Sequence, residues 1–237
     1  MFNCIEGVEN KIFHGINLKY YSNKLEDLKI FEEIIKSRKI MSRNDLIKMR
    51  YEHFECLPRI YEQCENEICF AMHPKNKNFS SIYCNDDSSS TFNEYIRFNI
   101  SFVFLESILN NGYSLQDGGE IRIPTSLDMD KDLVAIGCFD EIEYLLEKVN
   151  RGKSRNVMFS EQLIKCEDIH KYISEKKKRT YIIKNLLKKY GYNVPIIDPL
   201  TGNIIDGNYE KNVDGKNWSK VETKTKEKNV GSSYTSY

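Results

Sequence analysis

The stretch GGEIRIPTSLDMDKDLVAIG, residues 118–137, holds two short apolar segments separated by a polar bridge. Residues 120–123 (EIRI) alternate charged and aliphatic side chains, which predicts a short strand that ends at Pro124. Residues 133–137 (LVAIG) are uniformly apolar and predict a second strand. Asp140 then predicts the start of a helix. Strands therefore follow one another here without the regular strand–helix alternation of a parallel sheet.

Three further strands are predicted upstream of this stretch, at residues 10–14 (NKIFH), 67–72 (EICFAM) and 96–104 (IRFNISFVF). The last of them is the clearest, because its aliphatic and aromatic side chains alternate with Arg97, Asn99, Ser101 and Val103. A turn is expected directly after the first strand, at residues 15–17 (GIN). The polar segments 75–91 and 110–119 are rich in turn-forming residues and are expected to be loops.

Helical spacing of apolar side chains predicts two longer helices, at residues 25–37 and 167–190. Ser42 is placed to cap a short helix, and Gly191 to end the last helix in the left-handed conformation. Helices near both ends with consecutive strands between them predict an α+β fold in a single domain, residues 1–206. Residues 207–237 lose apolar periodicity and are expected to form a disordered tail.

The composition excludes several broad classes of protein. With 237 residues, 40% apolar and 12% aromatic, the chain can bury a core and is not disordered throughout. Its 35 basic and 35 acidic side chains balance, which excludes a generally basic coat for nucleic acid but not a local patch. No apolar run approaches the ~20 residues of a membrane span, and the opening residues lack a signal-like apolar core. We therefore expect a cytoplasmic protein with no membrane partner.

Familiar catalytic and metal-binding motifs are absent from the sequence. It contains no P-loop, no glycine-rich dinucleotide fingerprint, no nucleophile elbow and no HExxH pair. Its four histidines and seven cysteines lack ligand spacing and no CxxC occurs, so no metal site is expected. The odd number and irregular spacing of the cysteines fit reduced thiols.

Two short segments carry candidate chemistry. His14 precedes Gly15 at the end of a predicted strand, which sets an imidazole beside backbone that a ligand can approach closely. Glu120 follows two glycines and opens a strand, where a carboxylate can stabilise positive charge in a transition state. The alternative interpretations are a half-buried structural histidine and a solvated glutamate at a turn.

Several segments together resemble the ADP-ribosyltransferase superfamily, in the branch whose site combines a histidine with a later glutamate. The resembling segments are KIFHGINLKY (11–20), FEEIIKSRKIMSRNDL (31–46), EICFAMHP (67–74), EYIRFNISFVF (94–104), GGEIRIPTSLDMDKDLVAIG (118–137) and YGYNVPIIDPLTGNII (190–205). The block at 118–137 is the most specific of them. The resemblance implies a split, mixed or antiparallel sheet flanked by helices, with a C-terminal helix and a flexible tail.

The resemblance also implies an activity. NAD would be the co-substrate, ADP-ribose would move to a macromolecular acceptor, either protein or nucleic acid, and nicotinamide would leave. The similarity to small bacterial or phage members implies a role as a toxin, with an antitoxin protein as a possible partner.

Six residues receive roles from the resemblance. His14 would bond the ribose beside nicotinamide, and Glu120 would be the catalytic carboxylate that steadies the oxocarbenium-like centre. The other implied contacts are the Gly15 backbone on the nicotinamide amide, Phe70 stacked on nicotinamide, and Ser42 with Arg43 near the phosphates. For Ser42 and Arg43, the alternative is an ordinary helix cap followed by an exposed arginine.

The sequence departs from the family pattern at one informative position. Gly118 stands two residues before Glu120, where arginine-modifying members carry Glu or Gln, and this argues against an arginine acceptor. Glu161 is a second, lower-ranked candidate carboxylate. The alternative function is a non-catalytic nucleotide- or protein-binding module on the same fold. The basic run at 174–179 (SEKKKR) could bind phosphate, although a solvated helix face is favoured.

Overall fold

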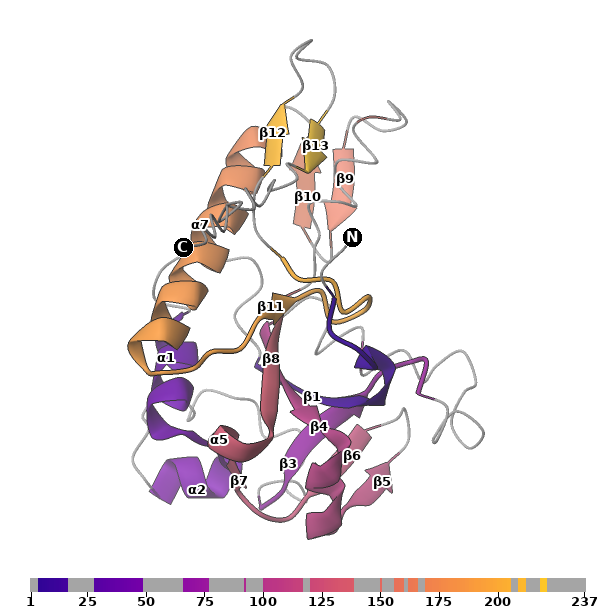
Figure 1. Ribbon diagram of the computed structural model, residues 1–237, viewed down its shortest axis with the longest axis vertical. Helices are drawn as coiled ribbons and strands as arrows, with labels where there is room; N and C mark the ends of the chain where they lie inside the picture. Colours follow the sequence, from indigo (N-terminus) through magenta and orange to yellow (C-terminus); the bar gives the residue numbers. More distant parts are fainter. Residues whose placement is uncertain are drawn as a thin grey trace, which may run out of the picture.

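A seven-stranded sheet organises the computed structural model (Figure 1). The structure describes residues 4–16, 28–48, 66–76, 92, 100–116, 120–138, 150, 156–159, 162–165, 169–205, 209–211 and 218–220. In spatial order the strands are β11 (Ile196–Ile197), β8 (Leu133–Cys138), β4 (Ile100–Leu105), β1 (Lys11–Ile16), β3 (Ile68–Met72), β6 (Glu120–Ile123) and β5 (Ser114–Gln116). Neighbouring strands are antiparallel except β11 and β8, which are parallel. The prediction of an α+β fold is confirmed.

Helices and smaller sheets surround this sheet. The helices are α1 (Leu28–Ser37), α2 (Arg43–Lys48), α5 (Met129–Asp132) and α7 (Ile169–Lys189), with 3-10 turns η1 (Val8–Asn10) and η7 (Glu106–Asn111). The paired short strands are β2 (Lys39–Ile40) with β7 (Leu127–Asp128), β9 (Asn156–Phe159) with β10 (Gln162–Lys165), and β12 (Tyr209–Lys211) with β13 (Trp218–Lys220). Among the described residues, no helix is both long and apolar enough to span a membrane.

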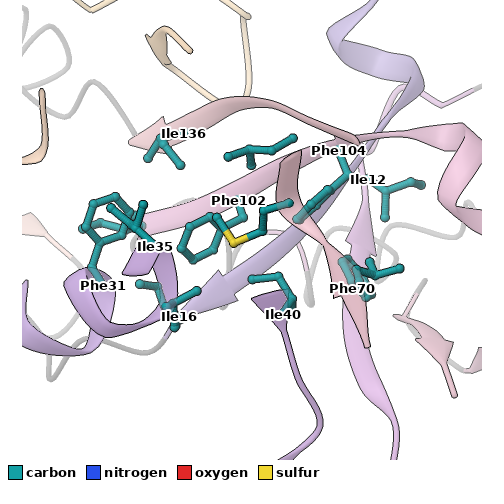
Figure 2. Packing of buried hydrophobic residues seen from close by; sticks show 14 of the residues in the cluster. Ile12, Ile16, Phe31, Ile35, Ile40, Phe70, Phe102, Phe104 and Ile136 are labelled. Carbon is teal, nitrogen blue, oxygen red and sulfur yellow. The ribbon is translucent and has the colours of Figure 1, made fainter. Parts of the chain in front are cut away.

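The two faces of the seven-stranded sheet are covered differently. One face packs against helices α1 and α7 and carries aromatic and branched aliphatic side chains from most strands (Figure 2). Because these side chains form the larger of two buried clusters, we call it the large-cluster face. Its members include Ile12, Phe70, Phe102, Phe104 and Ile136 from the sheet, Phe31 and Ile35 from α1, and Ile183 and Leu187 from α7. The opposite face, which we call the small-cluster face, carries a smaller buried cluster. It consists of Phe13, Ala71, Val103, Ala135 and Ile197, covered by Val8 and Phe92.

Strand β4 confirms the described part of the strand predicted at 96–104 and is buried on both faces. From Ile100 to Phe104 every side chain of β4 is buried, including Ser101 and Val103. β4 lies between β8 and β1 in the middle of the sheet, with both faces covered. Residues 93–99, the first part of the predicted strand, lie outside the described residues.

Other predicted boundaries also shift. β1 runs through Gly15 to Ile16, so the turn predicted at residues 15–17 is wrong for these two positions, and Asn17 lies outside the described residues. The segment 110–119, expected to be a loop, contains strand β5. Within 207–237, where the sequence predicts no regular structure, the structure describes the pair β12 and β13. The predicted helix after Asp140 and the expected loop at 77–91 lie outside the described residues.

The long helix α7 follows its sequence signals. It ends at Lys189, and Gly191 adopts the predicted left-handed conformation, with φ 78°. Lys189 Nζ lies 2.8 Å from Glu32 Oε1 of α1, and the Tyr190 hydroxyl donates to the same oxygen at 2.9 Å. These contacts fasten the C-terminal end of α7 to α1.

The first described residues and the segment after β11 meet beside the sheet. Ile5 N–H donates to the Gly202 carbonyl at 3.0 Å, and Cys4 forms an isolated bridge with Asn203. Ile204 forms a second bridge with Ile197 of β11. Residues near the two ends of the described chain therefore close one edge of the fold together.

Candidate functional site

His14 lies where strands β1 and β3 stop pairing. The ladder between these strands contains two residue pairs, against six between β1 and β4. Directly after the second pair, Nδ1 of His14 lies 2.8 Å from the carbonyl oxygen of Cys69 in β3. A side chain therefore replaces the backbone donor that would continue the ladder. The His14 ring lies 5.3 Å from that of Phe70, centroid to centroid.

The bond to Cys69 fixes the chemical state of His14. A carbonyl oxygen only accepts, so Nδ1 carries the hydrogen. Burial lowers the pKa of His14 below its ordinary value, and the bond to the Cys69 carbonyl opposes this to a smaller extent. The ring is therefore neutral at pH 7, with an unprotonated Nε2. Within the described part of the chain this nitrogen has no hydrogen-bond partner, so it can accept a bond from a ligand.

Gly15 continues the strand after His14. It pairs with Ser101 of β4, and Ser101 in turn pairs with Gly137 of β8. Residues paired in this way project to the same face, so two glycines flank one serine across three strands. Because Gly15 has no side chain, none covers its backbone on this face. Gly15 lies within the strand and not in the expected turn.

Phe70 does not have the exposure that the resemblance implies. Its side chain is 2% exposed and lies in the large cluster, where its ring meets that of Phe104 edge-on at 5.9 Å (Figure 2). No ring face is open to a ligand in this conformation. The strand EICFAM was predicted correctly, but the buried register of Phe70 makes it part of the core.

Glu120 is held by a neighbouring arginine. Arg122 Nε donates to Glu120 Oε1 at 2.6 Å, and the two side chains are 16% and 20% exposed respectively. Arg122 Nη1 also lies 3.9 Å from Glu67 Oε2. Both charged side chains are mostly shielded from water, and a charge-assisted hydrogen bond in such a place is better ordered than an exposed one. Arg122 therefore fixes the orientation of the Glu120 carboxylate.

The sheet register separates His14 from Glu120. His14 pairs with Phe102, which belongs to the large cluster, whereas Glu120 pairs with Ala71, which belongs to the small cluster. Paired residues share a face, so the two side chains project to opposite faces with β3 between their strands. The structure therefore does not form the shared cleft that we expected. The expectation assumed that His14 ends its strand, but β1 continues to Ile16.

Ser42 has the structural role that its alternative interpretation describes. It is 4% exposed, its hydroxyl donates to Asp45 Oδ2 at 2.9 Å, and Asp45 N–H donates back to Oγ at 3.2 Å. This reciprocal arrangement caps α2. Arg43 is the first residue of α2, and its side chain lies outside the described part of the structure. Glu161 also lies outside the described residues.

Sequence reasoning missed a buried histidine on the small-cluster face. His73 Nε2 lies 3.0 Å from the Leu200 carbonyl, and Lys75 N–H donates to Nδ1 at 3.1 Å. Its ring packs against Phe92 with centroids 5.3 Å apart and lies 6.2 Å from Phe13. Both nitrogens are used, which assigns His73 a structural role. No local signal marks it, because one partner lies 127 residues away.

Sequence reasoning also missed the packing of Ser101 against Gly137. Ser101 is fully buried, and its hydroxyl has no partner among the described residues. A Cβ placed on Gly137 would lie 2.2 Å from Ser101 Oγ and 3.3 Å from Pro199 Cβ. Gly137 therefore provides the space that the serine hydroxyl occupies.

Comparison of the chain with protein-family models, curated proteins and solved structures finds no match. Within the described residues, no group of three or more His, Cys, Asp or Glu side chains is placed to hold a metal ion. The site must therefore be interpreted from its own geometry, in which Nε2 of His14 is an acceptor without a partner among the described residues.

Proposed function

We propose that the chain binds NAD at His14 and transfers ADP-ribose to a macromolecular acceptor, with release of nicotinamide, as an ADP-ribosyltransferase of the histidine–glutamate branch. One observation carries the binding half of this proposal. The neutral His14 ring lies where β1 and β3 stop pairing, with Nε2 able to accept a bond. Pairing between β1 and β3 ends after two residue pairs, and this supports the more specific proposal that the sheet is split between these strands.

Ligand binding at this point uses the tautomer that the Cys69 carbonyl selects. Nε2 accepts a hydrogen bond from a ribose hydroxyl, while Nδ1 keeps the ring in place. We propose that the Gly15 backbone contacts the nicotinamide amide, although the space left by its missing side chain lies on the face of Ser101, opposite the His14 ring. Phe70 is buried and supplies no stacking surface, so we propose no aromatic partner for nicotinamide within the described residues.

Transfer breaks the bond between the ribose anomeric carbon and the nicotinamide nitrogen. The bonding electron pair leaves with nicotinamide, and positive charge develops on the ribose. We propose Glu120 as the carboxylate that stabilises this charge, with Arg122 directing it. This catalytic half rests on the resemblance, since Glu120 projects to the other face of the sheet.

That opposite placement favours a second candidate function. A protein that binds the nucleotide through His14 without breaking it needs no carboxylate on the same face. The ion pair of Glu120 with Arg122 then has a structural role on the small-cluster face and no catalytic one. This is the non-catalytic binding module on the same fold.

Thermal shift and nicotinamide release separate the two candidates. The variants are His14→Asn, whose amide can still donate to the Cys69 carbonyl but lacks the Nε2 acceptor, and Glu120→Gln. Glu67→Gln is the matched control, because Glu67 also faces Arg122 and has no proposed contact with NAD. NAD should raise the melting temperature of every form except His14→Asn.

Nicotinamide release then decides whether the bound NAD is cleaved. A transferase releases nicotinamide in the wild type and in Glu67→Gln, with at least a roughly hundredfold loss in Glu120→Gln. A stabilising shift without release in any form supports the binding module. The absence of any shift with the wild type overturns both candidates.

A further inference from the structure

We propose that the exposed face of α7 binds single-stranded nucleic acid, through lysines that contact phosphates and through Tyr181, which stacks on a base. The helix is strongly basic, although the chain as a whole is neutral. Residues Ile169–Lys189 contain eight lysine and arginine residues and one glutamate. This leaves 27 basic and 34 acidic side chains in the rest of the chain. The positive charge is therefore local, although the whole chain is neutral.

The exposed side chains of α7 form one stripe. Six exposed residues recur at intervals of three or four and therefore share one face: Lys171, Ser174, Lys178, Tyr181, Asn185 and Lys188, with Lys184 beside them. On the opposite side, Ile183 and Leu187 are buried in the large cluster. From Lys171 to Lys188 the stripe extends about 26 Å at ~1.5 Å per residue. Figure 1 shows α7 along one side of the molecule, with its N-terminal half extending past the seven-stranded sheet.

Tyr181 sits in the middle of this stripe. It is 66% exposed, more than Tyr113 at 42% or Leu105 at 38%. An exposed tyrosine between lysines presents a flat ring where a chain of phosphates would run. Aromatic rings in such positions stack on unpaired bases, which explains why a strongly exposed ring is useful here.

A groove adjoins the C-terminal half of the stripe. It has a volume of about 490 Å³ and is lined by Lys184 and Lys188 on the helix and by apolar side chains including Ile196 and Ile205. A cationic rim beside an apolar floor suits a nucleotide, whose phosphate and base have these two characters. Lys189 is not counted in the stripe, because it is paired with Glu32.

The same observations disfavour a lipid surface as the partner. A helix that lies on a membrane needs an apolar face to bury in the lipid. The apolar residues Ile183 and Leu187 of α7 already pack against the sheet, which leaves Tyr181 as the exposed aromatic group of the stripe. Duplex nucleic acid is also disfavoured, because its bases are stacked on one another and offer no face to Tyr181.

Fluorescence anisotropy tests the proposal without NAD, so its result is independent of the proposed transferase activity. The probes are labelled 15-nucleotide dT and rU strands, a 15-base-pair DNA duplex, and vesicles containing phosphatidylserine. The variants are Lys178→Glu with Lys188→Glu, and Tyr181→Ala alone. The matched control is Lys39→Glu with Lys131→Glu, which makes the same charge change at two exposed lysines outside α7.

The expected result is salt-dependent binding of a single strand that exceeds binding of the duplex and the vesicles. The two-lysine variant in α7 should lose at least tenfold in affinity at 50 mM salt and show a shallower salt dependence. Tyr181→Ala should lose roughly tenfold or more, and the control variant should stay within about threefold of the wild type. The dT and rU arms distinguish DNA from RNA as the preferred strand.

Four outcomes overturn the proposal. They are no binding by the wild type at 50 mM salt, equal loss in the α7 and control variants, tighter binding of the duplex or vesicles than of either strand, and no effect of Tyr181→Ala. Circular dichroism melting of each variant guards against unfolding. The altered side chains are exposed, so the melting temperatures should match that of the wild type.

Discussion

His14 and His73 each form a hydrogen bond with a backbone carbonyl, yet they differ in how many ring nitrogens the protein binds. His14, on the large-cluster face, uses Nδ1 only, toward Cys69. His73, on the small-cluster face, uses both nitrogens, toward Leu200 and Lys75. The comparison shows that burial alone does not make a histidine structural. What decides is whether both nitrogens are satisfied by the protein.

The largest difference should appear in stability after substitution by leucine. His73→Leu leaves the Leu200 carbonyl and the Lys75 N–H without partners in a buried site, and we expect a loss of about 3 kcal/mol in the free energy of unfolding. His14→Leu removes one bond and should cost about 1 kcal/mol. Urea unfolding of both variants measures this. Equal losses would break the comparison.

A second, smaller effect tests the small-cluster face beside His73. In Gly137→Ala the new methyl group meets the Ser101 hydroxyl, and we expect a loss of about 2 kcal/mol. In a Ser101→Ala background the hydroxyl is gone, so the same change should cost less than half as much. A double-mutant cycle by urea unfolding measures this coupling. Strictly additive effects would show that Gly137 and Ser101 do not share the space.

The third prediction uses pH to sharpen the contrast. Burial lowers the pKa of both histidines from 6.5 in the folded state, so the unfolded chain binds more protons below that pH. The stability that the neutral rings contribute is fully present above about pH 6.5 and is lost as pH falls toward the lowered values. Facing charges at His73 are Lys75, which lowers its pKa, and Glu9 and Asp198, which raise it. Unfolding measured from pH 7.5 to 5.5 should show a flatter decline in His14→Asn than in the wild type.

The smallest expected effect is that of His14→Asn on stability at pH 7.5. The asparagine amide can replace Nδ1 as the donor to Cys69, so the free energy of unfolding should change by less than about 1 kcal/mol. Denaturation at pH 7.5 checks this beside the NAD thermal shift. A larger loss would mean that His14, like His73, is mainly structural.

Local sequence patterns predicted most of the fold. The strands at 120–123, 133–137 and 67–72, the cap at Ser42 and the stop at Gly191 depend on neighbours within a few residues, and all are confirmed. Burial of β4 on both faces was not predictable in this way. It depends on which segments cover the second face, and Val8 and Phe92 are remote in sequence.

The candidate site was predicted only in part. His14 was expected at the end of its strand, whereas the structure places it where pairing with β3 ends while β1 continues to Ile16. The register could not be read from the sequence, and one residue of register decides the face to which a side chain projects. Extension of β1 to Ile16 places His14 within the strand, on the face opposite Glu120. The roles of His73 and Ser101 depend on partners in other strands and loops.

The meeting of residues 4–5 with residues 202–203 has a consequence for synthesis on the ribosome. β11 and the contacts of Ile5 with Gly202 and of Cys4 with Asn203 form only after residue 205 has emerged. At ~5–20 residues per second, β1 is made roughly 10 to 40 s before these partners exist. β8 is complete only at residue 138, so its edge on the β11 side is unpaired for roughly the last 3 to 13 s of that interval. Nascent-chain chaperones can contact this edge during that time, and a pause in translation between codons 138 and 205 prolongs it.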